Sequence, residues 1–374
     1  MLTTLLFKFS AFVWRSLSAI LPRRNNSITL CTYPDFDDTL RAMQIAAANR
    51  NIFIDLLVAS DAPRTPDWVD PQVVRVHSKS SIKGIFAFHR STATLYTHGL
   101  YSKFPILNSR PTLNLWHGMP IKKIASLDPR SGSTLPKSHW VIADDEFFRP
   151  IMASAFDLKE VQVIIMEHPR LDILMSPPDR KRLLDAPGSK LLLWMPTYRR
   201  STRGEIRSDS RASPIPNEHE MRRLDAVLGR LDATLLIKLH PMETIKKTHF
   251  PVFERIEIVD DDVLRQQGLS LYQLLGMADG LITDISSVFF DFRRTGRPIW
   301  IYFPDKDQYD ASRGFVAPLD QLVDRPILSD FCDLIEDIEL SFAKTGGVRR
   351  ETELKLDGAN KALDLLLTKQ GTAG

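Results

Sequence analysis

The sequence predicts an α/β protein made of two doubly wound domains, and three observations support this fold class. Short apolar runs alternate with helical stretches, as expected for parallel strands that helices cover on both faces of a sheet. The alternation occurs twice, on either side of a proline-containing break at residues 175–178. The chain has 374 residues, a length that suits two domains of ordinary size.

The expected elements follow from these runs. Asp37 and Asp38 are suited to cap a helix directly after the first strand. An arginine-rich loop, 199–216, separates the first two strands of the second half, and its basic character suits phosphates, a membrane face or simple solvation. The expected strands are 27–32, 51–60, 73–78, 93–99, 113–118, 139–144, 161–167, 190–198, 233–240, 255–260, 280–285 and 298–303. The expected helices after the break are 217–231, 270–278, 287–295, 328–343 and 351–368.

The chain divides into four expected regions. Residues 1–24 form an amphipathic helix, 25–178 a first domain, 179–345 a second domain, and 346–374 a C-terminal helix that folds back across both. Two doubly wound domains predict a cleft between them, and open α/β sheets bind ligands at the carboxyl ends of their strands. Functional residues are therefore expected where strands end.

Composition excludes several classes of protein. Hydrophobic residues make up 43% and charged residues 25% of the chain, which excludes a disordered chain and a polytopic membrane protein. Cys31 and Cys332 are the only cysteines, so a disulfide framework and a cysteine-based zinc site are excluded and a reducing, cytoplasmic compartment is favoured. A net charge of +3 is too small to indicate nucleic acid. The sequence motifs of P-loop kinases, NAD dehydrogenases, serine hydrolases and zinc proteases do not occur.

The first 24 residues are basic and amphipathic. On helical spacing Leu5, Phe9, Phe12 and Trp14 belong to a broad apolar face. Charges such as Lys8 lie inside the apolar run, which leaves it too short to span a membrane and disfavours a secretion signal. The helix therefore either lies in a membrane interface, with its arginines near anionic headgroups, or packs on the domain behind it.

One histidine stands at a tight corner. His117 ends the predicted strand 113–118 and is followed by Gly118 and Pro120, which suit a turn into a helix. Lys122 and Lys123 would then lie one turn further on. Such an imidazole can take a proton from a hydroxyl, and the lysines can hold an anionic substrate. A purely structural His-Gly corner would explain the same residues.

A second histidine ends another strand. Lys238 and His240 lie two residues apart, so both side chains point to the same side of the strand 233–240. An ammonium and an imidazole on one face would bind a phosphate. A buried, hydrogen-bonded core histidine is the alternative.

Hydroxyl groups open the helix 287–295. Ser286 and Ser287 stand where a helix presents unpaired backbone N–H groups, which favours phosphate binding. A plain N-cap by Ser286 explains the same residues without a ligand.

Two further strands end in polar groups. Thr197 lies at the end of the predicted strand 190–198 and Arg199 comes directly after it, and the Arg199 guanidinium suits a diphosphate. Arg313 is expected in a glycine-containing turn after the last strand.

Acidic residues provide no metal site in this interpretation. The run 260–262 has no supporting histidine and is expected to be a solvated loop. Asp35, Asp37 and Asp38 are explained by turn and cap chemistry. No metal is therefore predicted.

The order of these motifs resembles that of the CDP-glycerol glycerophosphotransferase family, the primases and polymerases of teichoic acids and related capsules. The resemblance covers residues 33–315. The motifs that carry it are Tyr33–Asp38, Leu115–Lys123, Pro169–Asp172, Met195–Arg199, Lys238–Pro241, Thr283–Phe292 and Tyr309–Phe315.

The resemblance implies a fold and a reaction. The fold would be glycosyltransferase-B-like, with two Rossmann-like domains that face a cleft. The protein would be a peripheral protein at the cytoplasmic face of the cell membrane. The reaction would transfer glycerol phosphate or ribitol phosphate from a CDP-polyol to a hydroxyl of a lipid-linked or glycan acceptor, with release of CMP. The CDP-polyol is a substrate, so no cofactor is expected.

The resemblance also implies roles for individual residues. It assigns His117 to activation of the acceptor, His240 to a second functional histidine, and Ser286, Ser287 and Arg313 to the donor. Residue chemistry adds Thr197, Arg199 and Lys238 to the donor side, and Lys122 and Lys123 to the acceptor side.

The chain departs from the family pattern at Glu167, where the family often has glycine. A left-handed backbone there would be strained by glutamate, so a different loop shape and acceptor choice are expected. The extended N-terminal region of the large polymerases does not occur, so a primase or short capsule enzyme fits as well as a long-chain polymerase. A nucleotide-sugar transferase of the same fold and a catalytically silent nucleotide-binding assembly subunit stay open as alternatives. The sequence gives no oligomeric state.

Overall fold

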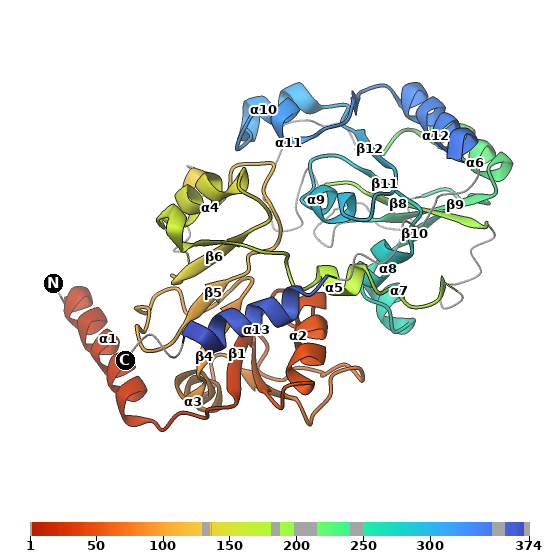
Figure 1. Cartoon of the computed structure of the whole chain (residues 1–374). Coiled ribbons are helices and arrows are strands. Elements are labelled where there is room, and N and C mark those ends of the chain that lie inside the picture. The colour runs from red at the N-terminus through yellow and green to blue at the C-terminus, as the bar shows by residue number, and fades with distance from the viewer. Residues whose placement is uncertain are drawn as a thin grey trace. The chain divides into compact units, whose positions relative to one another are not determined.

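The computed structural model describes residues 2–128, 135, 137–180, 188–197, 215–239, 250–345 and 356–369. The chain forms two compact units, each with its own parallel sheet (Figure 1). The first unit consists of Met1–His117, Ala125–Ile173 and Lys355–Gly374, and the second unit consists of Gly118–Ile124 and Leu174–Leu354.

The first unit contains a seven-stranded parallel sheet in the order β3-β2-β1-β4-β5-β6-β7. The strand β1 is buried along its whole length, as an apolar run covered on both faces should be. Its strands are β1 Ser27–Cys31, β2 Phe53–Val58, β3 Val74–Ser78, β4 Ala93–Tyr96, β5 Thr112–Asn114, β6 Trp140–Ala143 and β7 Val163–Ile165.

Helices cover this sheet. The helix α2 begins at the predicted cap, because the Asp37 carboxylate accepts the Leu40 N–H at 3.0 Å. The capping prediction is thus confirmed for Asp37, whereas the Asp35 carboxylate accepts the Ala59 N–H from a segment 24 residues away and is not a local cap. The helices of the first unit are α1 Leu2–Ile20, α2 Asp38–Ala48, α3 Ile82–Arg90, α4 Phe148–Phe156 and α13 Gly358–Lys369; α5 Leu171–Leu174 ends at the boundary of the two units.

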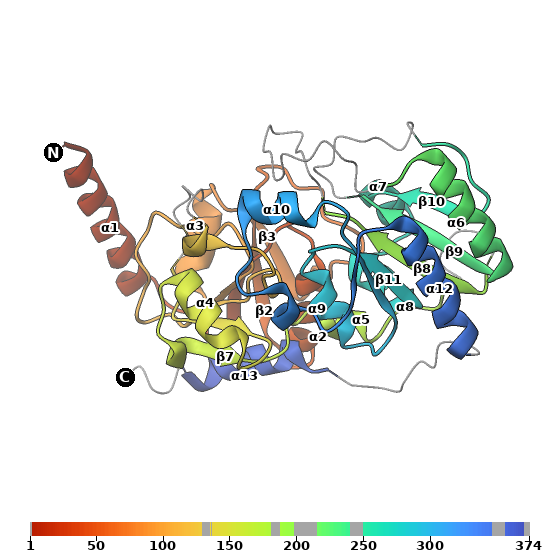
Figure 2. The ribbon, with the colours of Figure 1, turned by 90° about the horizontal axis from the view of Figure 1, so that it is seen from above.

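The second unit repeats the architecture with a six-stranded parallel sheet, in the order β10-β9-β8-β11-β12-β13. The helices α6 and α12 lie side by side (Figure 2), and their side chains form a core with β8, β9 and β12. The strands are β8 Lys190–Met195, β9 Ala233–Lys238, β10 Ile256–Val259, β11 Gly280–Thr283, β12 Ile299–Tyr302 and β13 Ile327–Leu328. The helices are α6 Glu218–Arg230, α7 Asp261–Gln266, α8 Leu271–Met277, α9 Val288–Arg293, α10 Lys306–Arg313, α11 Leu319–Leu322 and α12 Phe331–Thr345.

The predicted α/β class with two parallel sheets is confirmed, whereas the predictions for the end of β5 and for residues 309–313 are wrong. The strand β5 ends at Asn114, so His117 follows it by three residues and belongs to a separate corner. Residues 309–313 are helical, because they complete α10, and the glycine-containing turn begins only at Gly314.

The C-terminal helix α13 packs beside α2 of the first unit (Figure 1). The Asp172 carboxylate accepts the Gly358 and Ala359 N–H groups, each at 2.9 Å, and so satisfies the first turn of the helix. Lys361 forms an ion pair of 2.6 Å with Glu167. Segments far apart in the sequence are thereby joined in one unit.

The backbone at Glu167 is not left-handed, which agrees with the expected difference in loop shape. Glu167 is not among the residues of the described chain that adopt a positive φ. Its ion pair with Lys361 gives this position a different use, because the glutamate side chain helps to hold α13.

The helix α1 is anchored to the first unit by its C-terminal half. Trp14 is only 4% exposed and stacks on Phe104, with ring centroids 4.2 Å apart. Ser18 accepts a hydrogen bond from Arg110 Nε at 3.1 Å and contacts His89 Nδ1 at 2.8 Å. Burial and the Arg110 charge lower the His89 pKa to about 4, so a neutral ring can accept the Ser18 proton. Trp14 and Ser18 therefore face the protein, which corrects the assignment of Trp14 to a membrane-facing surface.

Other residues of α1 stay exposed. Phe9 and Phe12 have exposed fractions of 66% and 67%, and the N-terminal end of the helix points away from the rest of the first unit (Figures 1 and 2). None of the described helices is long and apolar enough to cross a membrane.

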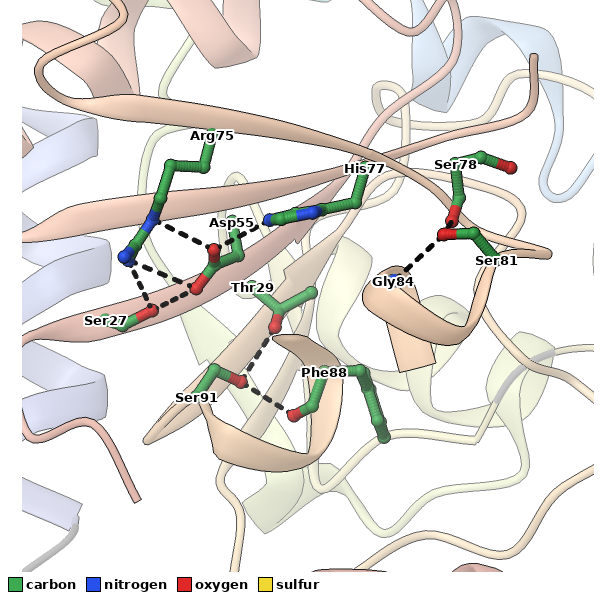
Figure 3. Close-up of polar contacts among 10 residues, drawn as sticks. All are labelled: Ser27, Thr29, Asp55, Arg75, His77, Ser78, Ser81, Gly84, Phe88 and Ser91. Atoms are coloured by element: carbon green, nitrogen blue, oxygen red, sulfur yellow. Dashed lines mark hydrogen bonds and ion pairs between the residues drawn. The ribbon is translucent and has the colours of Figure 1, made fainter. Parts of the chain in front are cut away.

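A buried carboxylate ties the edge of the first sheet together (Figure 3). Asp55 on β2 is fully buried and contacts His77 Nε2 at 3.0 Å and Arg75 Nε at 3.1 Å, both on the edge strand β3. The Ser27 hydroxyl of β1 also donates to it. Burial alone would raise the Asp55 pKa, but the hydrogen bonds from His77 and Ser27 and the Arg75 charge outweigh it and lower the pKa. The ionised carboxylate thus joins three strands.

We expect Asp55→Ala to lower the free energy of unfolding by about 3 kcal/mol, because it leaves Arg75 and His77 without their buried partner. The lowered pKa means that this contribution is complete above 3.8, the ordinary value, and is lost as the pH falls through the folded-state pKa. Urea unfolding at pH 7 and pH 3 measures both effects. The exposed Asp67→Ala serves as the control and should change stability by less than about 0.5 kcal/mol. A wild-type advantage that is equal at both pH values would contradict the assignment.

Candidate active site

The corner that carries His117 is built by its neighbours. Trp116 adopts φ 52°, a left-handed conformation that is unfavourable for a bulky residue, and Gly118 follows at φ 114°. The Asn114 side-chain oxygen accepts the Trp116 N–H at 2.9 Å, and His168 Nε2 lies 3.1 Å from the Trp116 carbonyl oxygen. The strained peptide is therefore held from both of its polar groups.

His168 is fixed in one protonation state by its surroundings. Its Nδ1 accepts the Arg170 N–H at 3.2 Å, which leaves Nε2 to donate to Trp116. Burial, reinforced by the Arg170 charge, lowers the His168 pKa well below the ordinary value. A neutral ring is the form that supports both hydrogen bonds.

The His117 ring itself is exposed at the surface of the first unit. It packs on the Trp116 ring, with centroids 3.9 Å apart, and Trp116 in turn meets Phe156 edge-on at 4.8 Å. An exposed imidazole on a rigid corner is suited to take a proton from a bound hydroxyl near neutral pH. The sequence pattern identified His117, but it did not single out Asn114 or His168. An asparagine two residues before a left-handed residue was the available signal for Asn114.

The two lysines after His117 lie in the second unit. The chain enters that unit at Gly118, and Lys122 pairs with Phe315 in an isolated antiparallel bridge. The Lys123 N–H donates to the Gly314 carbonyl oxygen at 3.3 Å. No helix follows His117 before Ile124, so the expected helical turn with Lys122 and Lys123 on it is wrong. The acceptor-side role of both lysines stays a prediction.

Polar groups meet at the carboxyl ends of β8 and β11 in the second unit. The Thr197 N–H lies 3.2 Å from the Asp284 carboxylate, and the Thr197 hydroxyl also donates to it. Thr283 donates to the Met195 carbonyl oxygen at 3.0 Å. Because the two strands are neighbours, the structure brings Thr197 close to the motif that contains Ser286 and Ser287.

The two serines lie at the start of α9 and are partly exposed. Ser287 occupies the N-cap position and makes no side-chain capping hydrogen bond. The Ser286 hydroxyl accepts only a long contact of 3.5 Å from the Val288 N–H. The N-cap position thus belongs to Ser287 and not to Ser286, and donor binding by both hydroxyls stays a prediction.

The Lys238 ammonium was expected to bind phosphate, but its partners in the structure are protein groups. Its buried Nζ forms an ion pair of 2.9 Å with Asp261 and donates to the Leu239 carbonyl oxygen at 3.0 Å. Asp260 accepts the Val263 N–H as the N-cap of α7. The run 260–262 is thus a helix start with an ion-paired member, which corrects the prediction of a solvated loop.

Of the remaining predicted donor residues, the structure describes Arg313 but not Arg199 or His240. Arg313 is the last residue of α10, and the C-cap Gly314 has φ 74°. Arg199 and His240 lie outside the described residues. Within the described ranges, no group of three or more His, Cys, Asp or Glu side chains is placed to hold a metal ion.

Solved structures share this two-sheet fold. The structure of the wall teichoic acid polymerase TagF aligns with 99% of this chain and 97% of its own, with a TM-score of 0.72 and 18% identity. The UDP-GlcNAc 2-epimerase from Neisseria meningitidis aligns with 92% of this chain and 99% of its own, with a TM-score of 0.51 and 11% identity. At these identities the similarity establishes the fold alone.

The sequence comparison establishes the family. The model of the CDP-glycerol:poly(glycerophosphate) glycerophosphotransferases matches residues 14–356, and the chain belongs to this family.

Curated relatives include a primase and a polymerase. A teichoic acid ribitol-phosphate primase from Bacillus spizizenii is 32% identical over 199 residues, which cover 51% of this chain and 47% of the primase. A teichoic acid poly(glycerol phosphate) polymerase from the same organism is 26% identical over 371 residues, which cover 90% of this chain and 88% of the polymerase. The chain therefore matches about half the length of the first relative and most of the second.

We expect Asn114→Ala to lower turnover about 10- to 100-fold, because the Trp116 N–H loses its acceptor and the His117 imidazole moves from its position. The Kd for CDP-glycerol should stay within about twofold of the wild-type value, since the substitution lies in the first unit and the predicted donor residues belong to the second. Steady-state kinetics and isothermal titration calorimetry measure the two quantities. Unchanged turnover in a folded Asn114→Ala protein would show that the corner needs no such support.

Proposed function

We propose that the protein transfers a polyol phosphate from a CDP-polyol to an acceptor hydroxyl and releases CMP. The observation that carries the proposal is the family match over residues 14–356, which includes the rigid corner of His117. The relatives act in teichoic acid synthesis with glycerol phosphate and ribitol phosphate, as their names state. Membership of this family also supports a lipid-linked or glycan acceptor.

The proposed chemistry is in-line displacement at phosphorus. The acceptor oxygen attacks the phosphorus that carries the polyol, its proton passes to the His117 imidazole, and the bond from phosphorus to the CMP oxygen breaks. Residues of the second unit, chiefly Ser286, Ser287 and Arg313, are proposed to bind the diphosphate. Hydrogen-bond donors and positive charge on the leaving group lower the barrier because they stabilise charge that develops in the transition state.

The test is a comparison of donors. Purified protein is incubated with CDP-glycerol, CDP-ribitol, UDP-glucose or UDP-N-acetylglucosamine and a soluble alkyl glycoside that carries one glycerol phosphate. We expect a mass increase of one polyol phosphate with a CDP-polyol and none with a UDP-sugar. His117→Ala should bind CDP-glycerol and lose about 10²- to 10⁴-fold in rate, whereas the exposed His219→Ala should match wild type. Sugar transfer, or no transfer from any donor, would refute the proposal.

Residues at the N-terminus are proposed to bind the membrane surface. Phe9 and Phe12 are exposed on α1, whereas Trp14 anchors the helix to the first unit. Arg15 and Arg23 are exposed as well. An exposed apolar pair with nearby cations suits an anionic lipid surface, because apolar burial and charge attraction add together.

We expect Phe9→Ser combined with Phe12→Ser to weaken binding to vesicles of phosphatidylglycerol and phosphatidylcholine by about tenfold or more, since the burial of each ring contributes roughly 1.5–3 kcal/mol. The melting temperature should not change, because neither ring is packed. Binding of the wild type should also weaken with added salt. Vesicle sedimentation and thermal melts provide the data, with the exposed Val161→Ser as the matched control. Equal sedimentation of the double variant and the control would rule out this surface.

A further inference from the structure

An additional histidine stands beside His117. His98 follows β4, the strand next to β5, and its ring centroid lies 5.8 Å from that of His117 in an edge-to-face arrangement. Tyr33 belongs to the segment after β1, and its ring centroid lies 5.7 Å from that of His98. The carboxyl ends of three adjacent strands or their following segments thus place a row of rings at one edge of the sheet. These separations are those at which aromatic rings interact.

The backbone around His98 is fixed. The Cys31 thiol donates to the His98 carbonyl oxygen at 3.4 Å, and Lys79 Nζ donates to the carbonyl oxygen of the next residue, Gly99. Burial raises the Cys31 pKa to about 12, so the thiol keeps the proton that it donates. The Thr97 N–H donates to the Cys31 carbonyl oxygen at 3.0 Å. Hydrogen bonds at and on both sides of His98 therefore fix the backbone that carries its ring.

Tyr33 is fixed in the same way. Its N–H donates to the Thr97 hydroxyl at 3.2 Å, yet its side chain is 58% exposed. His98 and His117 are exposed too. Burial of apolar surface does not explain the contacts among these three exposed rings. The contacts are explained if they orient one ring for function.

We propose that His98 is a positioning residue for the transfer reaction, and that its ring, supported by Tyr33, holds the His117 imidazole in the orientation that receives the acceptor proton. This inference rests on the proposed function. The Trp116 ring contacts His117 at 3.9 Å, so His117 packs against two ring neighbours from two strand ends. Removal of one neighbour gives the imidazole freedom to rotate away from the attacking oxygen. A displacement of this kind is enough to slow an enzyme substantially.

The contact predicts a particular pattern among variants. His98→Ala removes the ring, whereas His98→Phe keeps a ring and removes only the nitrogen atoms. We expect His98→Ala to lower kcat about 10- to 100-fold, with the KM for CDP-glycerol within twofold of wild type. His98→Phe should recover most of the lost kcat, and Tyr33→Ala should show a smaller loss than His98→Ala. The exposed His219→Ala on α6 is the matched histidine control and should behave as wild type.

A spectroscopic measurement keeps the inference separate from the proposed function. The ¹⁵N and ¹H resonances of the His117 ring are followed in wild type, His98→Ala and His98→Phe by NMR, without substrate. We expect the His117 signals to shift and broaden in His98→Ala and to stay near their wild-type positions in His98→Phe and His219→Ala. Unchanged His117 signals in His98→Ala, wild-type kcat in His98→Ala, or a His98→Phe protein as slow as His98→Ala would each overturn the positioning role. Failure of the wild type to transfer from any CDP-polyol would instead refute the proposed function. The NMR result would still show whether the His98 ring orients the His117 ring.

Discussion

The corner of the first unit that carries His117 depends on one strained peptide, that of Trp116. A tryptophan at φ 52° persists only where its surroundings compensate for the strain. Asn114 binds its N–H and His168 binds its carbonyl oxygen, so both polar groups are satisfied. This arrangement ends β5, turns the chain out of the sheet, and leaves the next side chain, His117, exposed on a rigid support. The chain crosses to the second unit immediately afterwards.

The second unit organises its strand ends by a different means. Asp284 after β11 binds the Thr197 backbone and hydroxyl after β8, which joins two neighbouring strand ends. Asp261 neutralises the buried Lys238 ammonium at the end of β9. Acidic side chains thus hold polar groups in place, and the partly exposed Ser286 and Ser287 follow directly. Donor binding by these serines is consistent with phosphate preference for hydroxyls and backbone N–H groups.

Most of the fold could be predicted from the sequence, because parallel strands are apolar on both faces and form conspicuous runs. The corner residues could not. Asn114 is only two residues from Trp116, but its role depends on the left-handed Trp116 backbone, which the sequence does not report. His168 bonds Trp116 from a position 52 residues away, and no local pattern reports such a contact. The Lys238 ion pair was missed for the same reason. The helical state of residues 309–313 was missed because Gly314 suggested a turn, whereas the glycine ends a helix in the left-handed conformation.

In the proposed reaction an acceptor oxygen attacks phosphorus rather than carbon. The nucleotide released from CDP-glycerol during acceptor extension tests it directly, because attack at phosphorus leaves CMP and attack at carbon leaves CDP. Ion-exchange chromatography of the nucleotides, with the extended acceptor quantified in the same samples, provides the measurement. We expect one CMP for each glycerol phosphate added. Release of CDP in step with acceptor extension would contradict it.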